Sequence, residues 1–294
     1  MKAPIFTGSS VAICTPFQDD KVNFPQLAQL IDFQIENGTA AIIVCGTTGE
    51  GTTLSKEEHI ETVDFCVKHV AGRVKVVASA GANVTRTCVA LGQAAEHSGA
   101  DGLLIVTPYY NKATQKGLVE HYFHIADRVN IPIILYNVPT RTGVGFTADT
   151  YQALSRHPLI NGTKESSSDF SLIARTIAAC GDDLNVWSGN DDNTVPMMAL
   201  GACGLISVAA NIIPRPLADM CEAALKGDFK QAAAIHLRYQ ALFDGLFMEV
   251  NPIPVKTSMN LMGMDVGDLR MPLCDMVPEN LEKLKNILAD CSLL

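Results

Sequence analysis

The sequence has no long uninterrupted apolar run. No window approaches the roughly 18 apolar residues that a transmembrane helix needs, and the N-terminus, Met1-Lys2-Ala3-Pro4, lacks the apolar core of a signal peptide. We therefore expect a soluble, cytosolic protein that has no membrane partner.

Motifs of disulfide and metal sites are also missing. The nine cysteines are scattered in apolar surroundings without a CxxC pair, which is typical of small core residues in a reducing compartment. There is no HExxH motif, and the adjacent Asp191 and Asp192 diverge on an extended chain and would equally cap the next helix. His121 and His124 lie three residues apart on a polar-looking helix, so we expect both at the surface. No metal is expected.

Runs of basic residues are absent as well. The net charge is −9 and the pI is near 5.2, and basic residues are not interleaved with aromatic ones. This pattern does not favour a nucleic-acid partner. It is still compatible with a pocket that gathers a few cations around an anionic metabolite.

The apolar residues that are present predict parallel strands. The chain has 294 residues, 48% of them hydrophobic, which suits one large α/β domain or two smaller ones. Eight β-branched runs read as continuous hydrophobic segments, as expected for parallel strands covered on both faces. They lie near residues 11–16, 40–45, 74–80, 102–107, 131–137, 160–165, 185–189 and 204–209.

The segments between these runs carry helix signals. Ser55-Lys56-Glu57-Glu58 is a capping box, and a glycine closes several helices just before a strand, at Gly38, Gly99 and Gly201. Eight βα units predict an α/β fold of the (β/α)8 TIM-barrel class. A doubly wound sheet fits less well, because no GxGxxG follows the first strand and eight units exceed its usual six or so strands.

After residue 210 the pattern is helical only, near residues 216–226, 229–249, 252–262 and 278–289. We expect residues 1–226 to form the barrel with the active site. Residues 227–294 would form a C-terminal helical extension that packs on the barrel or on another subunit.

Lys164 stands in the sixth run, close to apolar material. A buried ammonium loses its hydration, so a lysine here either ends the strand and points into water or is held inside for a purpose. Burial or a neighbouring cation lowers the pKa of a lysine, and lysines made neutral in this way form Schiff bases with carbonyl substrates. Lys164 is therefore the candidate nucleophile.

Other candidate groups follow the strands, where barrel enzymes place their chemistry. Gly46-Thr47-Thr48-Gly49-Glu50 offers N–H groups and hydroxyls for a carboxylate or oxyanion, or is a turn that leads to Ser55. Tyr136 suits proton transfer if it points toward the lysine, or is a packing residue. Arg141 offers a fork for a second carboxylate, or is solvated. Tyr109-Tyr110 would equally form an aromatic interface patch.

Together, these motifs resemble the dihydrodipicolinate synthase (4-hydroxy-tetrahydrodipicolinate synthase) family of pyruvate-dependent Schiff-base lyases and aldolases. The likeness covers essentially the whole chain, and the ordered set is more specific than any single motif. It is carried by Phe6-Thr7-Gly8-Ser9, Gly46-Thr47-Thr48-Gly49-Glu50, Thr107–Asn111, Tyr136-Asn137-Val138-Pro139, Arg141-Thr142-Gly143, Lys164-Glu165 and Asn251-Pro252-Ile253-Pro254-Val255-Lys256.

The resemblance implies condensation of pyruvate with L-aspartate 4-semialdehyde in lysine and diaminopimelate biosynthesis, with no cofactor. Lys164 would form the imine with pyruvate, and Tyr136 would be the acid and base, linked through Thr47 to Tyr110 in a proton relay. In the family the tyrosine at this last position comes from a neighbouring subunit, which implies a homotetramer built as a dimer of dimers. The implied binding residues are Thr48 for the pyruvate carboxylate, Arg141 for the carboxylate of the aldehyde, and Gly189 and Ile206 for the lining of the pyruvate pocket.

One departure concerns the site at which many members bind inhibitory lysine. His59, Asn83 and Tyr109 match that site, but Lys56 replaces a histidine and Thr87 replaces a glutamate. An added cation and a missing carboxylate both disfavour a cationic amino acid. We therefore expect weak or absent inhibition by lysine.

Three alternatives stay open. N-acetylneuraminate lyase and the 2-keto-3-deoxy sugar-acid aldolases share the barrel, lysine and tyrosine, although Thr47-Thr48 and Arg141-Thr142-Gly143 favour the dicarboxylate-like aldehyde over a polyol. A catalytically silent binding barrel is the non-enzyme alternative. Lys256 is a second candidate for the imine, disfavoured because Pro252 and Pro254 flank it outside the ring of strand ends.

Overall fold

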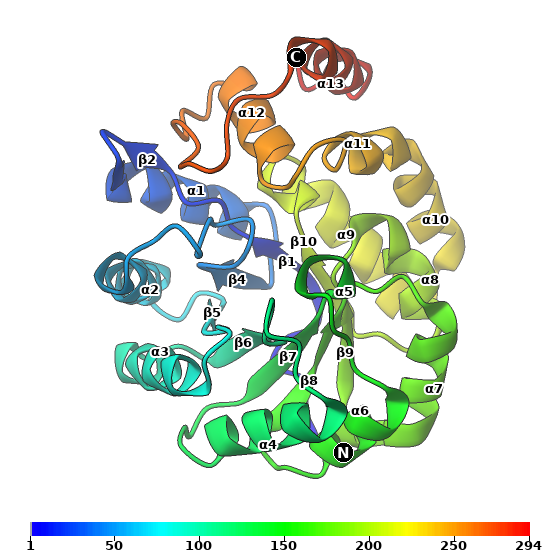
Figure 1. The fold of residues 1–294 in the computed structure, drawn as a ribbon. Helices are drawn as coiled ribbons and strands as arrows, with labels where there is room; N and C mark the ends of the chain where they lie inside the picture. The colour runs from blue at the N-terminus through cyan, green and yellow to red at the C-terminus, as the bar shows by residue number, and fades with distance from the viewer. Residues whose placement is uncertain (1) are drawn as a thin grey trace.

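The computed structural model describes residues 2–294, and in it eight parallel strands close into a barrel (Figure 1). Around the barrel the order is β1-β10-β9-β8-β7-β6-β5-β4, so strands that follow one another among these eight are also neighbours. Their bounds are β1 Gly8–Ala12, β4 Ala41–Val44, β5 Lys75–Ser79, β6 Gly102–Val106, β7 Ile133–Asn137, β8 Ile160–Glu165, β9 Asn185–Ser188 and β10 Gly204–Ser207.

A helix follows every strand of the barrel, and the helices form a ring around it (Figure 1). The predicted (β/α)8 barrel is therefore confirmed. The helices of the ring are α1 Phe24–Glu36, α2 Lys56–Val70, α3 Thr85–Ser98, α4 Gln115–Ala126, α6 Ala148–Ser155, α7 Phe170–Cys180, α8 Thr194–Ala199 and α9 Pro214–Leu225, with the short α5, Pro139–Thr142, between β7 and α6. Three 3-10 turns add η1 Gly181–Asp183, η2 Asp191–Asn193 and η3 Ala209–Asn211.

Two apolar layers hold the barrel together. The inner layer fills the cylinder, and its members include Phe6, Ile43, Leu104, Tyr136, Trp187 and Ile206. The outer layer lies between the strands and the helices, and it contains the alternate strand residues such as Val11, Ile42 and Leu135. Because both faces of each strand are covered, the strands read as continuous apolar runs in the sequence.

The helix boundaries follow the predicted signals. At α2, the Ser55 hydroxyl accepts from the Glu58 N–H and the Glu58 carboxylate accepts from the Ser55 N–H, so the capping box is confirmed. The three glycines expected to close helices all have positive φ, at +83° for Gly38, +90° for Gly99 and +105° for Gly201.

The first strand lies three to four residues earlier in the chain than predicted. It was expected at 11–16, whereas β1 covers Gly8–Ala12. The early residues are small and polar but buried, and Ser10 Oγ donates to the Leu205 carbonyl at 2.9 Å. Beyond β1 the chain forms a small hairpin that the sequence did not suggest, β2 Phe17–Gln18 and β3 Lys21–Val22, turned at two residues with positive φ, Asp19 and Asp20.

The C-terminal extension contains four helices: α10 Phe229–Arg238, α11 Gln240–Gly245, α12 Ile253–Leu261 and α13 Pro278–Asp290. The prediction of one continuous helix at 229–249 is therefore wrong, because this segment forms two helices that are separated at Tyr239. Helix α10 packs against α8 and α9 of the barrel, while α13 lies at the outer edge (Figure 1). No helix within residues 2–294 combines the length and apolarity required to cross a bilayer.

The prediction for His121 was wrong. Its side chain is buried on the inner face of α4, where Nδ1 lies 2.9 Å from Thr85 Oγ1 and the ring packs edge-on against Tyr122. Burial lowers the pKa of His121 to about 4. His124 is exposed, as expected.

Candidate active site

Lys164 lies near the carboxyl end of β8, and its side chain is only 5% exposed. In the barrel it stands in register with Tyr136 on β7 and Trp187 on β9. Lys164 Nζ lies over the Tyr136 ring, 4.4 Å from its centroid. The lysine therefore does not end the strand in water. Its amine and the tyrosine ring face each other inside the mouth of the barrel.

A cavity of about 1190 Å³ opens above this pair. It takes in most of the residues singled out from the sequence, namely Thr47, Thr48, Tyr136, Arg141, Lys164 and Gly189. Two others lie elsewhere: Ile206 is fully buried in the inner layer of the barrel, and Tyr110 is 91% exposed with φ +71°. The cavity is large enough for two small acids.

The loop after β4 forms one wall of the cavity. Cys45 and Glu50 both have positive φ, and the Gly51 N–H donates to the Gly46 carbonyl at 3.0 Å, which closes a tight turn. A Cβ on Gly51 would lie 2.1 Å from the Cys45 carbonyl oxygen, so only glycine fits there. This turn places Thr47 and Thr48 in the lining of the cavity.

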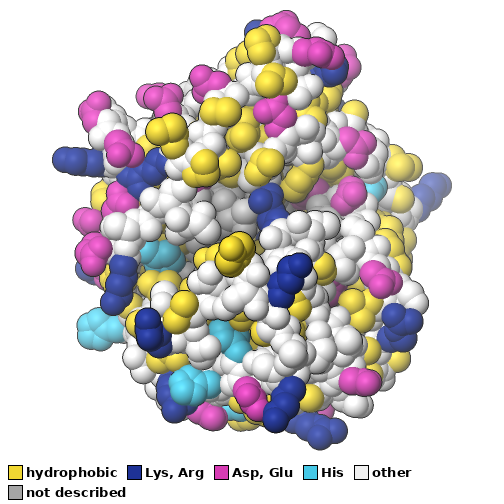
Figure 2. Space-filling model, in the orientation of Figure 1, with side chains coloured by type: hydrophobic (Ala, Val, Ile, Leu, Met, Phe, Trp, Pro, Cys, Tyr) yellow, Lys and Arg dark blue, Asp and Glu magenta, His cyan; other side chains and the backbone are white. Residues whose placement is uncertain are grey.

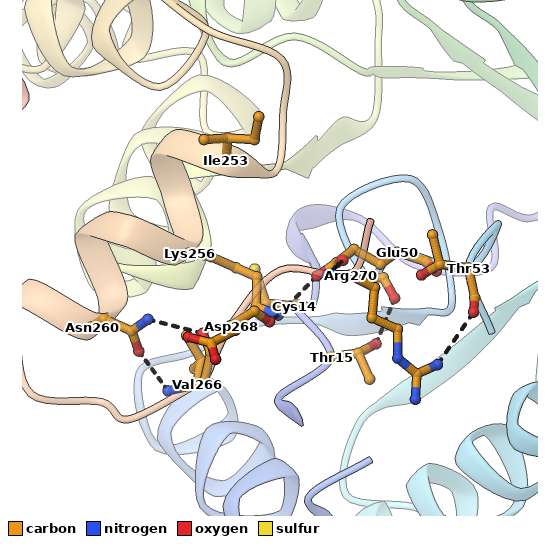
Figure 3. A network of polar contacts seen from close by, with 12 residues as sticks. Cys14, Thr15, Glu50, Thr53, Ile253, Lys256, Asn260, Val266, Asp268 and Arg270 are labelled. Atoms are coloured by element: carbon orange, nitrogen blue, oxygen red, sulfur yellow. Dashed lines mark hydrogen bonds and ion pairs between the residues drawn. The ribbon is translucent and has the colours of Figure 1, made fainter. Parts of the chain in front are cut away.

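The C-terminal extension fixes this loop from behind (Figure 3). Lys256 Nζ lies 2.8 Å from Glu50 Oε1 and donates to the Asp268 carbonyl at 2.8 Å, while Glu50 Oε2 accepts from the Arg270 N–H at 2.9 Å. The Lys256 and Glu50 side chains are 2% and 0% exposed. Lys256 is thus engaged with a carboxylate outside the cavity, whereas Lys164 Nζ forms no ion pair among residues 2–294.

Asn251 connects the extension to two of the predicted binding residues. Its Nδ2 donates to Thr48 Oγ1 at 3.0 Å, and its carbonyl accepts from Arg141 Nη2 at 3.3 Å. Arg141 belongs to α5, which ends at Gly143 with φ +69°. The hydroxyl on one wall and the guanidinium on the other are therefore held by the same residue.

A buried polar cluster lies on the opposite face of β8. Glu165 accepts from Asn137 Nδ2 at 2.9 and 3.0 Å, from Tyr151 Oη at 2.7 Å and from the Ser167 N–H at 2.8 Å. Burial raises the pKa of the Glu165 carboxyl, and these hydrogen bonds oppose that rise. Since neighbouring residues of a strand point to opposite faces, anchoring Glu165 outward keeps Lys164 pointing inward.

Comparisons with known proteins agree along the whole chain. The profile of the Dihydrodipicolinate synthetase family matches residues 5–291. The chain belongs to this family. The 4-hydroxy-tetrahydrodipicolinate synthase of Thermoanaerobacter sp. (strain X514) is 49% identical over 99% of this chain and 98% of its own length.

Solved structures of the family superpose closely on this fold. The dihydrodipicolinate synthase of Aquifex aeolicus matches with a TM-score of 0.96 and 48% identity, covering 98% of this chain and 99% of its own. The chloride-inhibited enzyme from Acinetobacter baumannii, solved in complex with pyruvate, also has a TM-score of 0.96, with 41% identity, 98% of this chain and 99% of its own covered.

Four of the five positions compared above with a lysine site line the same cavity: Lys56, His59, Thr87 and Tyr109. His59 Nε2 lies 2.8 Å from the Ser79 carbonyl, and burial lowers the pKa of its ring. Lys56 and Thr87 are exposed. The side chains expected to discourage lysine are therefore close to the residues that match the family.

No group of three or more His, Cys, Asp or Glu side chains within residues 2–294 could hold a metal ion. Asp191, one of the two adjacent aspartates, is buried and accepts from Ser207 Oγ at 2.5 Å and from the N–H groups of Val208 and Ala209 at 3.2 and 3.1 Å. It therefore caps the turn η3 that follows β10 and ties β9 to β10. The alternative left open for this pair was that they cap the next helix, but the N-terminus of that helix, α8, has no side-chain capping hydrogen bond.

Sequence reasoning missed three residues of the site: Glu50, Asn251 and Ser166. Glu50 and Asn251 stood within motifs that carried the resemblance, but their partners lie 206 and 203 residues away, so no local pattern reveals them. Ser166 follows the Lys164-Glu165 pair directly, and alternation along a strand was the one signal that could have placed it beside the lysine.

Proposed function

We propose that this chain catalyses the reaction for which its relatives are named, the synthesis of 4-hydroxy-tetrahydrodipicolinate from pyruvate and L-aspartate 4-semialdehyde. The observation that carries the proposal is the buried Lys164 amine, which faces the Tyr136 ring at 4.4 Å under a cavity lined by hydroxyls and one guanidinium. This arrangement supports a nucleophilic amine with an acid and base beside it.

The proposed sequence starts when Lys164 Nζ attacks the ketone carbon of pyruvate. The carbinolamine loses water to give an imine, and Tyr136 shuttles the protons. Loss of a methyl proton then gives an enamine, because the imine nitrogen accepts the electron pair of the broken C–H bond. The enamine carbon attacks the aldehyde carbon, and the aldehyde oxygen takes up a proton. The amine of the new chain finally displaces Lys164 and closes the ring, so that two substrates give one product and one water without a cofactor.

Thr48 and Arg141 are the proposed carboxylate partners. The Thr48 hydroxyl already accepts from Asn251 Nδ2, so its own proton is free to donate to the pyruvate carboxylate. Arg141 has one side of its fork on the Asn251 carbonyl, and the rest faces the cavity for the carboxylate of the semialdehyde. Gly189 leaves room for the lysine, and Ile206 supports the floor below.

Thr47 and Tyr110 would complete the proton relay, with Tyr110 acting in the site of a neighbouring subunit. Its 91% exposure in the single chain supports this role, because an exposed tyrosine is available to a second copy. Figure 2, drawn in the orientation of Figure 1, shows hydrophobic side chains on the upper part of the molecule, near the C-terminal helices. Exposed members of that part of the chain include Phe247, Val250 and Met271. We therefore propose a homotetramer, a dimer of dimers.

We also keep the proposed division of the chain into a barrel, 1–226, and an extension, 227–294. It falls between α9 and α10. The two parts are not independent in function, since Asn251, Lys256 and Arg270 of the extension reach the loop after β4.

The test is to incubate the protein with pyruvate and sodium borohydride and to locate the adduct by mass spectrometry. We expect a reduced pyruvate adduct on Lys164 and none in Lys164→Ala, which would also lose turnover of pyruvate with L-aspartate 4-semialdehyde. An adduct on another residue would exclude the mechanism. Turnover of N-acetylneuraminate with none of the semialdehyde would instead assign the chain to the sugar-acid lyases.

A further inference from the structure

Ser166 places a hydroxyl beside the reactive lysine. It follows β8, and its N–H donates to the Asn137 carbonyl at 2.9 Å, so the ladder between β7 and this segment continues through it. Residues two apart on an extended chain point to the same side. Lys164 and Ser166 therefore both face the cavity, while Glu165 between them faces α6.

Gly189 defines how close the two side chains are. A Cβ on Gly189 would lie 1.9 Å from Ser166 Oγ, 2.9 Å from Lys164 Cε and 3.0 Å from Lys164 Cγ. Both side chains thus lie against Gly189, the residue that directly follows β9, and the serine hydroxyl lies near Cε, the carbon that carries the lysine amine. A side chain at 189 would displace this hydroxyl before anything else.

The hydroxyl of Ser166 has no hydrogen-bond partner among residues 2–294, although the residue is only 8% exposed. A buried polar atom without a partner costs folding free energy, and most such atoms in folded proteins are satisfied. The neighbouring polar groups do not relieve it: the Glu165 carboxylate is turned to the other face of the strand. A buried hydroxyl without a partner calls for an explanation, and for Ser166, at the wall of a cavity, a ligand that enters the cavity and accepts its hydrogen bond provides one.

We propose that Ser166 is a further substrate-binding residue, whose hydroxyl donates a hydrogen bond to the carboxylate of the 2-keto acid attached to Lys164. This rests on the proposed function, in which a keto acid forms an imine at Nζ. The carboxylate carbon of such an imine is only three bonds from Cε, so a group beside Cε on the cavity side is within its reach. Rotation of the serine about χ1 is enough to turn its hydroxyl from Gly189 toward that carboxylate. The anion would then be held by two hydroxyls, those of Thr48 and Ser166.

The test compares imine trapping at Lys164 in the wild type and in Ser166→Ala, using sodium cyanoborohydride and peptide mass spectrometry. Two probes are used: pyruvate, which carries a carboxylate, and acetaldehyde, which does not. We expect Ser166→Ala to slow trapping of pyruvate by about tenfold or more, the range for a hydrogen bond to a charged group. Trapping of acetaldehyde should be unchanged, and the KM for pyruvate should rise more than kcat falls.

Ser9→Ala is the matched control. Ser9 is also buried, and its hydroxyl has no hydrogen-bond partner within residues 2–294, but it lies in β1 and does not line the cavity. Neither alanine variant should lower the thermal midpoint, because neither hydroxyl is bonded in the free protein. Ser9→Ala should trap both probes at the wild-type rate.

Each other result overturns a definite claim. Equal slowing with both probes would show that Ser166 acts on the lysine or on packing, and unchanged trapping with both would show that it does not touch the substrate; both outcomes reject the inference alone. A drop of several degrees in the thermal midpoint of Ser166→Ala would show that the hydroxyl is bonded within the protein, and would reject it too. Failure of the wild type to trap pyruvate at Lys164 would reject the proposed function itself.

Discussion

Asn251 Nδ2 donates to Thr48 Oγ1 across 203 residues of sequence, at a distance of 3.0 Å. The donor belongs to the C-terminal extension and the acceptor to the loop after β4. The hydroxyl that we propose for the pyruvate carboxylate is therefore oriented by a residue that lies outside the barrel strands. Because Asn251 already orients the Thr48 hydroxyl, substrate binding has less rotational freedom of this side chain to remove.

Replacing Asn251 by Ala should raise the KM for pyruvate by about two- to tenfold, the usual range for one neutral hydrogen bond. Asn251→Asp should act in the same direction, because it keeps the size and removes the Nδ2 donor. Steady-state kinetics with varied pyruvate measure both. Asn260→Ala is the control: Asn260 bonds Val266 and Gly267 within the same extension, so the KM should stay as in the wild type. An unchanged KM in Asn251→Ala would contradict the orienting role.

Tyr136→Phe keeps the ring under Lys164 Nζ and removes only the phenol. We expect kcat to fall by about 10²- to 10⁴-fold, as is usual for loss of a general acid and base. The borohydride adduct at Lys164 should still form because the amine remains, but more slowly, because Tyr136 no longer shuttles the protons of imine formation. Tyr239→Phe, a buried tyrosine outside the cavity, should leave kcat unchanged. Wild-type turnover in Tyr136→Phe would remove this residue from the chemistry.

Lys256→Met should destabilise the protein by about 3–5 kcal/mol, because it leaves the Glu50 carboxylate buried and unpaired. Urea unfolding followed by circular dichroism measures the change. The double variant with Glu50→Gln should recover part of the loss, since no charge is then left without a partner. Lys226→Met breaks an exposed pair with Glu222 and should have no measurable effect. Equal stability of Lys256→Met and the wild type would exclude the buried pair as a stabilising contact.

His121 should make the protein less stable in mild acid. Its folded pKa of about 4 lies below the ordinary 6.5, so between these values the unfolded chain binds a proton that the folded one does not. Stability is therefore lost as the pH falls from about 6.5 toward 4, by roughly 3 kcal/mol in all. His121→Phe should flatten this part of the curve of unfolding free energy against pH. Parallel curves for the two proteins over that interval would contradict the assignment.

Lysine should inhibit this chain weakly or not at all. Lys56 repels its ammonium groups, and Thr87 offers no carboxylate to pair with them, although both side chains line the cavity beside His59. Initial rates measured against lysine concentration test this. The double variant Lys56→His, Thr87→Glu should gain sensitivity relative to the wild type. Half-maximal inhibition of the wild type below about 1 mM would contradict the prediction.

Most of the barrel was predictable because its strands are buried on both faces and so appear as apolar runs. The exceptions have physical causes. Ser9 and Ser10 belong to β1 although they are polar, since small side chains fit where that strand meets β10. His121 was predicted at the surface because the sequence of its helix looks polar. That its ring faces inward and packs against Tyr122 is visible only in the structure.

The reactive pair was suggested by a lysine in an apolar strand, but its supports were not. The bonds from Lys256 to Glu50 and from Asn251 to Thr48 each join residues more than 200 positions apart. A sequence shows that such residues are polar, and not that they meet. Ser166 was overlooked for another reason: its importance comes from a hydroxyl without a partner, and a missing bond leaves no trace in the sequence.

The buried pair of Lys256 and Glu50 has a consequence for engineering the fold. A fragment that stops after the eighth βα unit would retain every residue proposed for bond making. Without Lys256, however, the Glu50 carboxylate would be buried without its cationic partner in the loop next to them. A design that transfers this chemistry to a barrel without the extension must therefore first replace Glu50 by an uncharged residue. Because residues of the C-terminal extension also hold the loop after β4, substitutions in the extension are suitable places to search for altered substrate preference.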